Sequence, residues 1–485
     1  MSQHRTVVTG GPVITQDDTL GDIADGALLI ENGRILEVGR TGDAFDGVDA
    51  EVIDARGGWI LPGMVDSHRH TWMALMRGFC ADQSLLQFLA RTFYGRGSIM
   101  EAEDAAISTT VGAWEALDAG VTTILDCHDC VNTPAHADAD VAALRASGIR
   151  SVYAYGMQHF DYEPAHFTTH GQRLDDARRL RSELFAADDD LSRMGMLLGD
   201  FGIVPFEDTA AEIRLARELG LTYASHTGAA TSSVLLRGLR ELHDRELLLE
   251  GHLHIHCPAL TRAEWQLIAD TGGKVTIAPE TEMQMGMGHP PFRAALDAGL
   301  APGLSTDIVG VGSGDLFSQM RLGLQLTRCT DHDAVHAAGT MPVAVDLGVR
   351  DALTWGTRNS ADALGMGDRI GSLTPGKYAD VIVVKPRMDL VRSSNPIGSI
   401  VLQSTAADVS TVLVNGVLRK RDGRLVGVDV AAVRRSAENA LDRIEKAASV
   451  LPNLDDAAIY GWFGQAERMA TKNFGGAYAG MFEGH

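Results

Sequence analysis

The feature that most constrains the fold is a regular alternation in the middle of the chain. Eight short apolar segments of strand length occur between residues 65 and 307, separated by segments such as DTAAEIRLAREL with helical spacing of apolar residues. This alternation is typical of a (β/α)8 barrel, an α/β fold whose functional side chains lie at the carboxyl ends of the strands. The expected strands are 65–70, 122–128, 150–156, 194–202, 221–228, 253–258, 274–280 and 303–307.

Short strands joined by turns flank this region on both sides. The dipeptides Asn32-Gly33 and Asn415-Gly416 are typical of hairpin turns between apolar runs. Because similar strands occur near both ends of the sequence, we expect them to form one small β-sandwich domain. An amphipathic helix and an aromatic tail follow, and the tail covers either its own barrel or a neighbouring subunit. The expected division is a composite β-sandwich over 1–61 and 376–430, the barrel over 62–375, and the helix and tail over 431–485.

The composition excludes several classes of protein. A formal net charge of −22 argues against a nucleic acid or an anionic membrane as partner. The first residues, MSQHRTVVTGG, lack the apolar core of a signal peptide, and no apolar segment is long enough to span a membrane. Five cysteines are an odd and sparse set that indicates a reducing compartment. We therefore expect a cytoplasmic enzyme that acts on a small molecule.

Side chains that can bind a metal end several of the expected strands. His68 and His70 share a face at the end of the first strand, because alternate side chains of a strand point the same way. His226 ends the fifth strand, His256 the sixth and Asp307 the last. An isolated His-x-His pair arises by chance, but several polar strand ends would be costly to bury without partners. Their position on one rim favours a shared metal ion.

Five motifs in this order span nearly the whole chain. They are LPGMVDSHRH at 61–70, HCPALT from His256, LSTD ending at Asp307, GDLFSQMRL after it, and DRIGSLTPGKYADVIVV at 368–384. Together they resemble the amidohydrolase superfamily. Within it, the chain is similar to the cytosine deaminase-like branch, which contains triazine hydrolases and adenosylhomocysteine-type deaminases.

This resemblance implies one divalent metal ion, held by His68, His70, His226 and Asp307. It also implies that His256 contacts the substrate or the activated water, and that Asp307 accepts the proton of that water. A bound ion lowers the pKa of its water towards about 7 and so supplies a nucleophile at neutral pH. Zinc is the expected ion, with iron and manganese as alternatives. A homodimer or a higher homo-oligomer is expected.

The lysine positions favour one ion over two. Binuclear relatives bridge their metals through a modified lysine, or occasionally another side chain, on the fourth strand. The expected fourth strand has no lysine, and Lys274 lies at the start of the seventh, which is the wrong end of the barrel. Asp200 remains as an unusual alternative bridge.

The fifth strand departs from the pattern of this branch. Deaminases of the branch carry His-x-x-Glu there, and the glutamate moves a proton to the ring and then to the leaving amine. Here the stretch is His226-Thr227-Gly228-Ala229, so Ala229 stands at the position of the acid. General acid catalysis typically contributes about 10²- to 10⁴-fold. We hypothesise that Glu280 or Glu282, after the seventh strand, replaces it or binds a cationic group; the alternative is a solvated pair of carboxylates.

Further candidates for substrate contact lie beside these motifs. Met283, Met285 and Met287 occur at every second position and would share one side of an extended loop, as an apolar lid or as part of the core. His128 at the end of the second strand and Trp72 just after the first are the other candidates, and for both a structural role is an open alternative.

The sequence as a whole predicts a metal-dependent hydrolase that attacks a carbon–nitrogen bond of a small cyclic or heteroaromatic substrate. Deamination is the favoured reaction. The departure at Ala229 keeps amide or lactam hydrolysis, or displacement of another leaving group, as alternatives. A scaffold without catalytic activity is a remote alternative, because all four metal positions are present.

Overall fold

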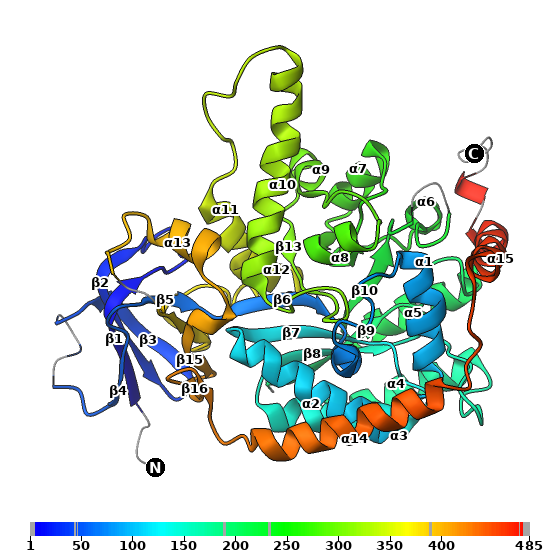
Figure 1. Ribbon diagram of the computed structural model, residues 1–485, viewed down its shortest axis with the longest axis horizontal. Helices are drawn as coiled ribbons and strands as arrows, with labels where there is room; N and C mark the ends of the chain where they lie inside the picture. The colour runs from blue at the N-terminus through cyan, green and yellow to red at the C-terminus, as the bar shows by residue number, and fades with distance from the viewer. Residues whose placement is uncertain are drawn as a thin grey trace.

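The fold consists of a parallel barrel and a separate mixed sheet that lie side by side (Figure 1). The computed structural model describes residues 5–478 except 43, 44, 46, 188–190, 231–233, 388, 389 and 475. The end of the predicted tail, residues 479–485, lies outside the described part of the chain.

The barrel is formed by eight parallel strands in sequential order, as predicted. Most of their residues are buried on both faces, which matches their continuous apolar runs. The first and last strands meet where the Asp307 amide donates to the His68 carbonyl (3.0 Å) and the His70 amide donates to the Asp307 carbonyl (2.9 Å). The strands are β6 (Met64–Arg69), β7 (Val121–His128), β8 (Arg150–Gly156), β9 (Ser192–Leu197), β10 (Thr222–Thr227), β11 (Leu253–His256), β12 (Lys274–Ile277) and β13 (Gly303–Leu304).

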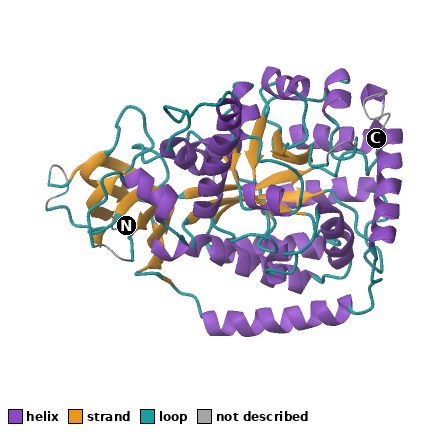
Figure 2. Ribbon diagram, turned by 45° about the horizontal axis from the view of Figure 1, so that its top comes forward, coloured by secondary structure: helices purple, strands orange, loops and turns teal. Residues whose placement is uncertain are grey.

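Helices surround these strands (Figure 2). A large apolar cluster joins the outer faces of the strands to the helices, while a second cluster fills the barrel interior. The surrounding helices are α2 (Ala102–Asp118), α3 (Pro134–Ser147), α4 (His170–Leu184), α5 (Phe206–Glu218), α6 (Leu239–Asp244), α7 (Arg262–Asp270), α8 (Pro279–Gln284), α9 (Phe292–Asp297), α10 (Leu316–Ala337), α11 (Val349–Thr354) and α12 (Ser360–Ala363), with a π-helical turn η3 (Trp355–Asn359) between the last two.

The last two predicted strands end earlier than expected. β12 stops at Ile277, because Pro279 at the first position of α8 favours a helix start. β13 comprises only Gly303–Leu304, and Asp307 has a left-handed backbone with φ of 62° that cannot continue a strand. The carboxylates of the Pro279–Gln284 stretch therefore lie on a helix and not on an extended loop.

The second sheet combines both ends of the chain, as predicted. Figure 1 shows the blue N-terminal strands beside the orange β15 and β16. The nine strands form one hydrogen-bonded sheet, and an apolar core draws residues from both halves of it. Its strands are β1 (Arg5–Val13), β2 (Ile23–Glu31), β3 (Arg34–Arg40), β4 (Glu51–Asp54), β5 (Trp59–Pro62), β14 (Val381–Val384), β15 (Val409–Val414), β16 (Val417–Arg421) and β17 (Arg424–Leu425), with α13 (Pro396–Gln403) and the short turn η4 (Ala406–Asp408) between β14 and β15.

The C-terminal segment covers the chain's own barrel. Helix α14 (Val430–Ala448) packs along α2, and α15 (Asp456–Phe474) contacts α1 (Leu85–Phe88) at the right of Figure 1. Asn473 on α15 donates a hydrogen bond to the Gly202 carbonyl after β9 (2.9 Å). An apolar cluster joins α15 to the 3₁₀ turn η1 (Thr71–Met76), the π-helical turn η2 (Leu89–Arg96) and α1, and the turn η5 (Gly476–Tyr478) extends it. Of the two predicted roles for the tail, the structure supports the intramolecular one.

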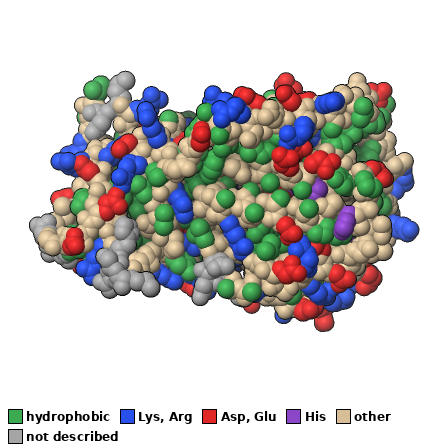
Figure 3. Space-filling view, turned by 90° about the horizontal axis from the view of Figure 1, so that it is seen from below, with side chains coloured by type: hydrophobic (Ala, Val, Ile, Leu, Met, Phe, Trp, Pro, Cys, Tyr) green, Lys and Arg blue, Asp and Glu red, His purple; other side chains and the backbone are tan. Residues whose placement is uncertain are grey.

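The surface carries no single large basic patch on the face drawn in Figure 3, where basic and acidic side chains are interspersed. Within the described ranges, no helix is long and apolar enough to cross a bilayer.

Candidate metal centre

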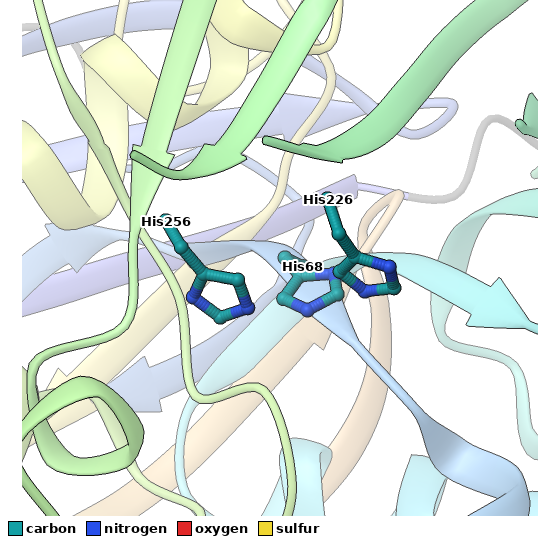
Figure 4. A group of neighbouring side chains, drawn as sticks. All are labelled: His68, His226 and His256. Carbon is teal, nitrogen blue, oxygen red and sulfur yellow. The ribbon is translucent and has the colours of Figure 1, made fainter. Parts of the chain in front are cut away.

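Four of the predicted ligands meet above the carboxyl ends of the barrel strands. Asp307 Oδ1 lies 3.0 Å from His68 Nε2 and 3.4 Å from His70 Nε2. His226 Nε2 lies 3.4 Å from His70 Nε2. Figure 4 shows the rings of His68, His226 and His256 converging on one space from β6, β10 and β11. The structure therefore brings together the set that the sequence predicted.

Each imidazole is held through its other ring nitrogen. His70 Nδ1 lies 2.7 Å from Asp129 Oδ2, and His226 Nδ1 lies 3.1 Å from Asp200 Oδ1. These carboxylates accept the Nδ1 proton and leave the Nε2 lone pair directed at the common space. Such partners behind metal-binding histidines fix the tautomer and the ring orientation.

The other two rings also have a partner at Nδ1. His256 Nδ1 lies 3.3 Å from Glu282 Oε1, and His68 Nδ1 lies 3.1 Å from the Cys127 sulfur. Ligand atoms of His68, His70 and Asp307 lie within 4.8 Å of one another, as do those of His68, His226 and His256. Three neutral imidazoles and one carboxylate suit a zinc-type divalent ion. The residues present thus fit a metal centre.

Charges around the centre explain the protonation states. Burial lowers the pKa of His68 to about 3, so this ring is neutral as a ligand must be. Burial also opposes protonation of His70, but the carboxylates of Asp129 and Asp307 outweigh it and raise the pKa to about 9. Burial alone would raise the pKa of Asp307, yet the neighbouring imidazoles lower it below its ordinary range. The centre therefore contains a fixed negative charge that attracts a cation.

The backbone is strained where the site is formed. His256, Cys257 and Asp307 all have positive φ angles, of 73°, 64° and 62°. Non-glycine residues rarely adopt this region, and such strain is concentrated at functional sites. The turns at these residues aim His256 and Asp307 into the space between the strands.

A cavity opens above the metal centre. Together with the open space at its mouth, it has an empty volume of about 430 Å³. Its floor is formed by His70, Asp200, His226, His256 and Asp307. Its wall is formed by Leu85, Phe88, Leu89, Phe93, Ala229, Leu236, Thr281, Met285 and Met287.

The two predicted carboxylates after the seventh strand have different places, and neither lines the cavity. Glu280 accepts hydrogen bonds from the Ser313 amide (2.8 Å), the Ser313 hydroxyl (3.0 Å) and Gln319 Nε2 (2.8 Å), so it ties α8 to α10. Glu282 is fully buried behind His256 and accepts from the Ala278 amide (3.0 Å). The structure thus places Glu280 outside the described lining of the cavity, and Glu282 touches the site only through His256.

Three predicted substrate contacts also lie outside the cavity. His128 is buried on the outer face of β7, where it pairs with Asp140 of α3, because the inward position is taken by Cys127. Trp72 lies beneath the cavity and donates from Nε1 to Asp129 Oδ2 (3.2 Å). Met283 is on helix α8, so the extended spacing does not apply to it, whereas Met285 does line the cavity.

Sequence reasoning missed Asp129 and Thr281, and it considered Asp200 only as a bridge between two metals. The acidic residues around His128 in DCHDC were a signal for Asp129. Thr281 carried no signal, since only the helix start at Pro279 directs it to the cavity.

Comparison with known proteins places these features in a family. The model of the amidohydrolase family matches residues 59–419, which include the barrel and all four ligands. The chain belongs to the amidohydrolase family. Two predictions from the sequence are thereby confirmed. The chain is an amidohydrolase, and it is a hydrolase that acts on carbon–nitrogen bonds.

Relatives of this amidohydrolase span nearly its full length. It is 29% identical over 466 residues to a 5-methylthioadenosine/S-adenosylhomocysteine deaminase of Symbiobacterium thermophilum, covering 92% of this chain and 99% of that protein. An adenosine deaminase from Xanthomonas campestris with bound zinc has a TM-score of 0.81 at 24% identity, covering 91% of this chain and 98% of that one. Atrazine chlorohydrolase from Arthrobacter aurescens, complexed with zinc, has a TM-score of 0.77 at 21% identity over 90% and 100% of the two chains.

Proposed function

We propose that this amidohydrolase removes an amino group from a small heteroaromatic ring by hydrolysis, using one zinc ion held by His68, His70, His226 and Asp307. The observation that carries the proposal is the convergence of three imidazole Nε2 atoms and one carboxylate at the floor of a cavity. The deaminases among its relatives support the reaction, and the zinc in two similar structures supports the metal.

The metal, when bound, lowers the pKa of a water and polarises the group that is attacked. Asp307 takes the proton from that water, because its carboxylate lines the cavity beside the ligand nitrogens. Asp307 Oδ2 also lies 3.9 Å from His256 Nε2, so both groups face one point. His256 Nε2 faces the same point and can donate a hydrogen bond to the attacking oxygen, which holds that oxygen in place.

Glu282 holds the ring of His256 and stabilises its cationic form. With Nδ1–H donated to the buried Glu282 carboxylate, a second proton on Nε2 creates a cation that this carboxylate stabilises. Burial raises the pKa of Glu282, and its hydrogen bond to His256 opposes that rise. We therefore assign Glu282 a positioning role in place of the direct proton transfer that the sequence predicted.

The leaving amine also needs a proton, and Ala229 cannot supply it. We assign this transfer to Asp307, which carries the proton taken from water and gives it to the nitrogen that leaves as ammonia. Because the Ala229 side chain cannot donate a proton, it also favours a second candidate reaction, in which the displaced leaving group requires no proton.

We further propose a homodimer or higher oligomer in the cytoplasm. The segment after α10 exposes three apolar side chains, Met341, Val343 and Val345, which suits burial against a second copy. All five cysteines are free, as a reducing compartment requires. Light scattering of the purified protein measures the oligomer.

The experiment that tests the reaction is incubation of the zinc-loaded protein with aminated heterocycles, lactams and substituted triazines in ¹⁸O-labelled water, followed by mass spectrometry. Replacement of an amine by labelled hydroxyl with release of ammonia is expected. Labelled water added without loss of ammonia would indicate ring or amide hydrolysis instead. A stoichiometric zinc content with no label in any compound would refute the proposed function.

A further inference from the structure

The wall of the cavity is apolar on almost every side. Two of its side chains come from α1, two from η2, two from the segment after β10 and two from the segment after α8. All belong to the cluster that α15 closes, or pack directly against it. They are Leu85, Phe88, Leu89, Phe93, Ala229, Leu236, Met285 and Met287.

Charged groups in the cavity are confined to its floor. Among the described lining residues there is no lysine or arginine, so a carboxylate or phosphate that reaches the wall would find no basic side chain there. Asp200 is the only carboxylate there besides Asp307, and His226 already engages it. An ionised group buried without a partner is strongly unfavourable. The wall therefore disfavours anionic substituents on the substrate.

Among the described lining residues of the wall, one carries a neutral polar group. Thr281 is 2% exposed and lines the cavity on α8. Within the described part of the chain its hydroxyl has no hydrogen-bond partner. Buried hydroxyls are nearly always paired, so this one is available to a ligand. A single hydroxyl can satisfy one polar atom but not the several hydroxyls of a sugar.

Ala229 belongs to the same wall. It is 3% exposed and lies in the apolar cluster with Leu236 and Met285. The position that carries a carboxylate in deaminases of this branch thus contributes to a dry surface here. The flexible side chains of Met285 and Met287 can adjust around a ring with alkyl groups.

We infer that the site takes an uncharged heteroaromatic ring whose remaining substituents are apolar, and that the Thr281 hydroxyl binds one polar atom at the edge of that ring. This inference rests on the proposed function and narrows its substrate class. Nucleosides are rejected because their sugar hydroxyls would be buried against leucine, phenylalanine and methionine side chains.

A matched set of three ligands tests the inference. They are 9-butyladenine, adenosine and 9-(4-carboxybutyl)adenine, which share one ring and one amino group and differ only in the substituent. Binding to the zinc-loaded full chain is measured by calorimetry. We expect 9-butyladenine to bind about 10- to 100-fold more tightly than adenosine, because unpaired hydroxyls cost about that much, and the carboxylate to bind weakest.

Equal or tighter binding of adenosine would overturn the inference. Turnover of the same three compounds is recorded separately, by release of ammonia. Deamination of adenosine at least as efficient as that of the butyl compound would refute the substrate class and leave the proposed function intact. Selective binding of 9-butyladenine without turnover would support the substrate class and count against deamination.

Two substitutions test the role of Thr281. Thr281→Val keeps the shape of the side chain and removes the hydroxyl, so binding of 9-butyladenine should weaken about fivefold to tenfold. Thr281→Ser is the matched control that keeps the hydroxyl and should bind like the wild type. Zinc content and thermal unfolding report whether either variant disturbs the fold. Wild-type affinity in a folded Thr281→Val variant would refute the assigned hydrogen bond.

Discussion

The floor and the wall of the cavity are built differently. The floor consists of polar side chains at the ends of barrel strands, and three of its histidines have a carboxylate behind the ring. The wall consists of apolar side chains on short helices and connecting segments, held together by packing with α15. The comparison teaches that the floor sets the chemistry through fixed hydrogen bonds, while the wall sets what enters.

The largest effect should come from the centre of the floor. Asp307→Asn removes the proton acceptor and one ligand, so kcat should fall on the order of 10³-fold or more. Asp297→Asn, on the exposed end of α9, is the matched control and should leave kcat unchanged. Steady-state kinetics with zinc analysis measure both. More than a tenth of wild-type activity in Asp307→Asn would contradict the assigned base.

The carboxylate behind His70 should have the second largest effect. Asp129→Asn removes the charge that orients His70, so zinc affinity should fall about 10- to 100-fold. Asp138→Asn, in a partly exposed pair with Arg179, is the control. Competition with a chelator measures the affinity. Unchanged zinc affinity in Asp129→Asn would show that packing alone orients this ring.

The two glutamates on α8 should differ in their effects, because Glu282 supports His256 at the floor and Glu280 only links α8 to α10. Glu282→Gln removes the carboxylate that stabilises protonated His256, so kcat should fall about tenfold or more, with a shifted pH profile. Glu280→Gln should leave kcat within about twofold and lower the unfolding free energy by about 1 kcal/mol, because only the link to α10 weakens. The reverse order of effects on kcat would restore Glu280 as a functional residue.

Zinc binding should depend on pH through His70. Its pKa of about 9 in the metal-free protein means that a proton must leave before zinc binds. Zinc affinity should therefore rise about tenfold per pH unit from roughly pH 7 to 9 and level off above. In Asp129→Asn the His70 pKa falls, so the plateau should begin at lower pH. A pH-independent affinity over this range would contradict the His70–Asp129 charge pair.

A substitution in the wall should have the smallest effect on zinc binding and should change mainly the KM for the substrate. Leu89→Ala removes apolar contact from the wall, so KM for an alkylated ring should rise several-fold, while zinc content stays at the wild-type level. Equilibrium dialysis and kinetics measure the two quantities. Loss of zinc in this variant would mean that floor and wall are not independent.

Much of the floor was predictable, and the wall was not. The eight strands, and the histidines and Asp307 at their ends, follow from local apolar runs and from the alternation of side chains in a strand. The choice of four of these residues as ligands follows from the family resemblance. At the end of β7 the same alternation turns Cys127 inward and His128 towards α3, and which of the two faces inward was not predicted. The helix that starts at Pro279 was not predicted either, and it replaces the start of the extended loop that was expected to carry Met283, Met285 and Met287.

The sequence by itself determined the barrel and the family, and it placed the side chains that could bind a metal at the strand ends, since these features depend on short-range patterns and on motifs of fixed spacing. Tertiary structure decided which carboxylate lies behind His70, His226 and His256, that α15 covers its own barrel, and that Thr281 is the one unpaired hydroxyl among the described residues of the wall. These contacts join residues far apart in the chain. Their geometry depends on how helices pack over the strand ends, which no local pattern encodes.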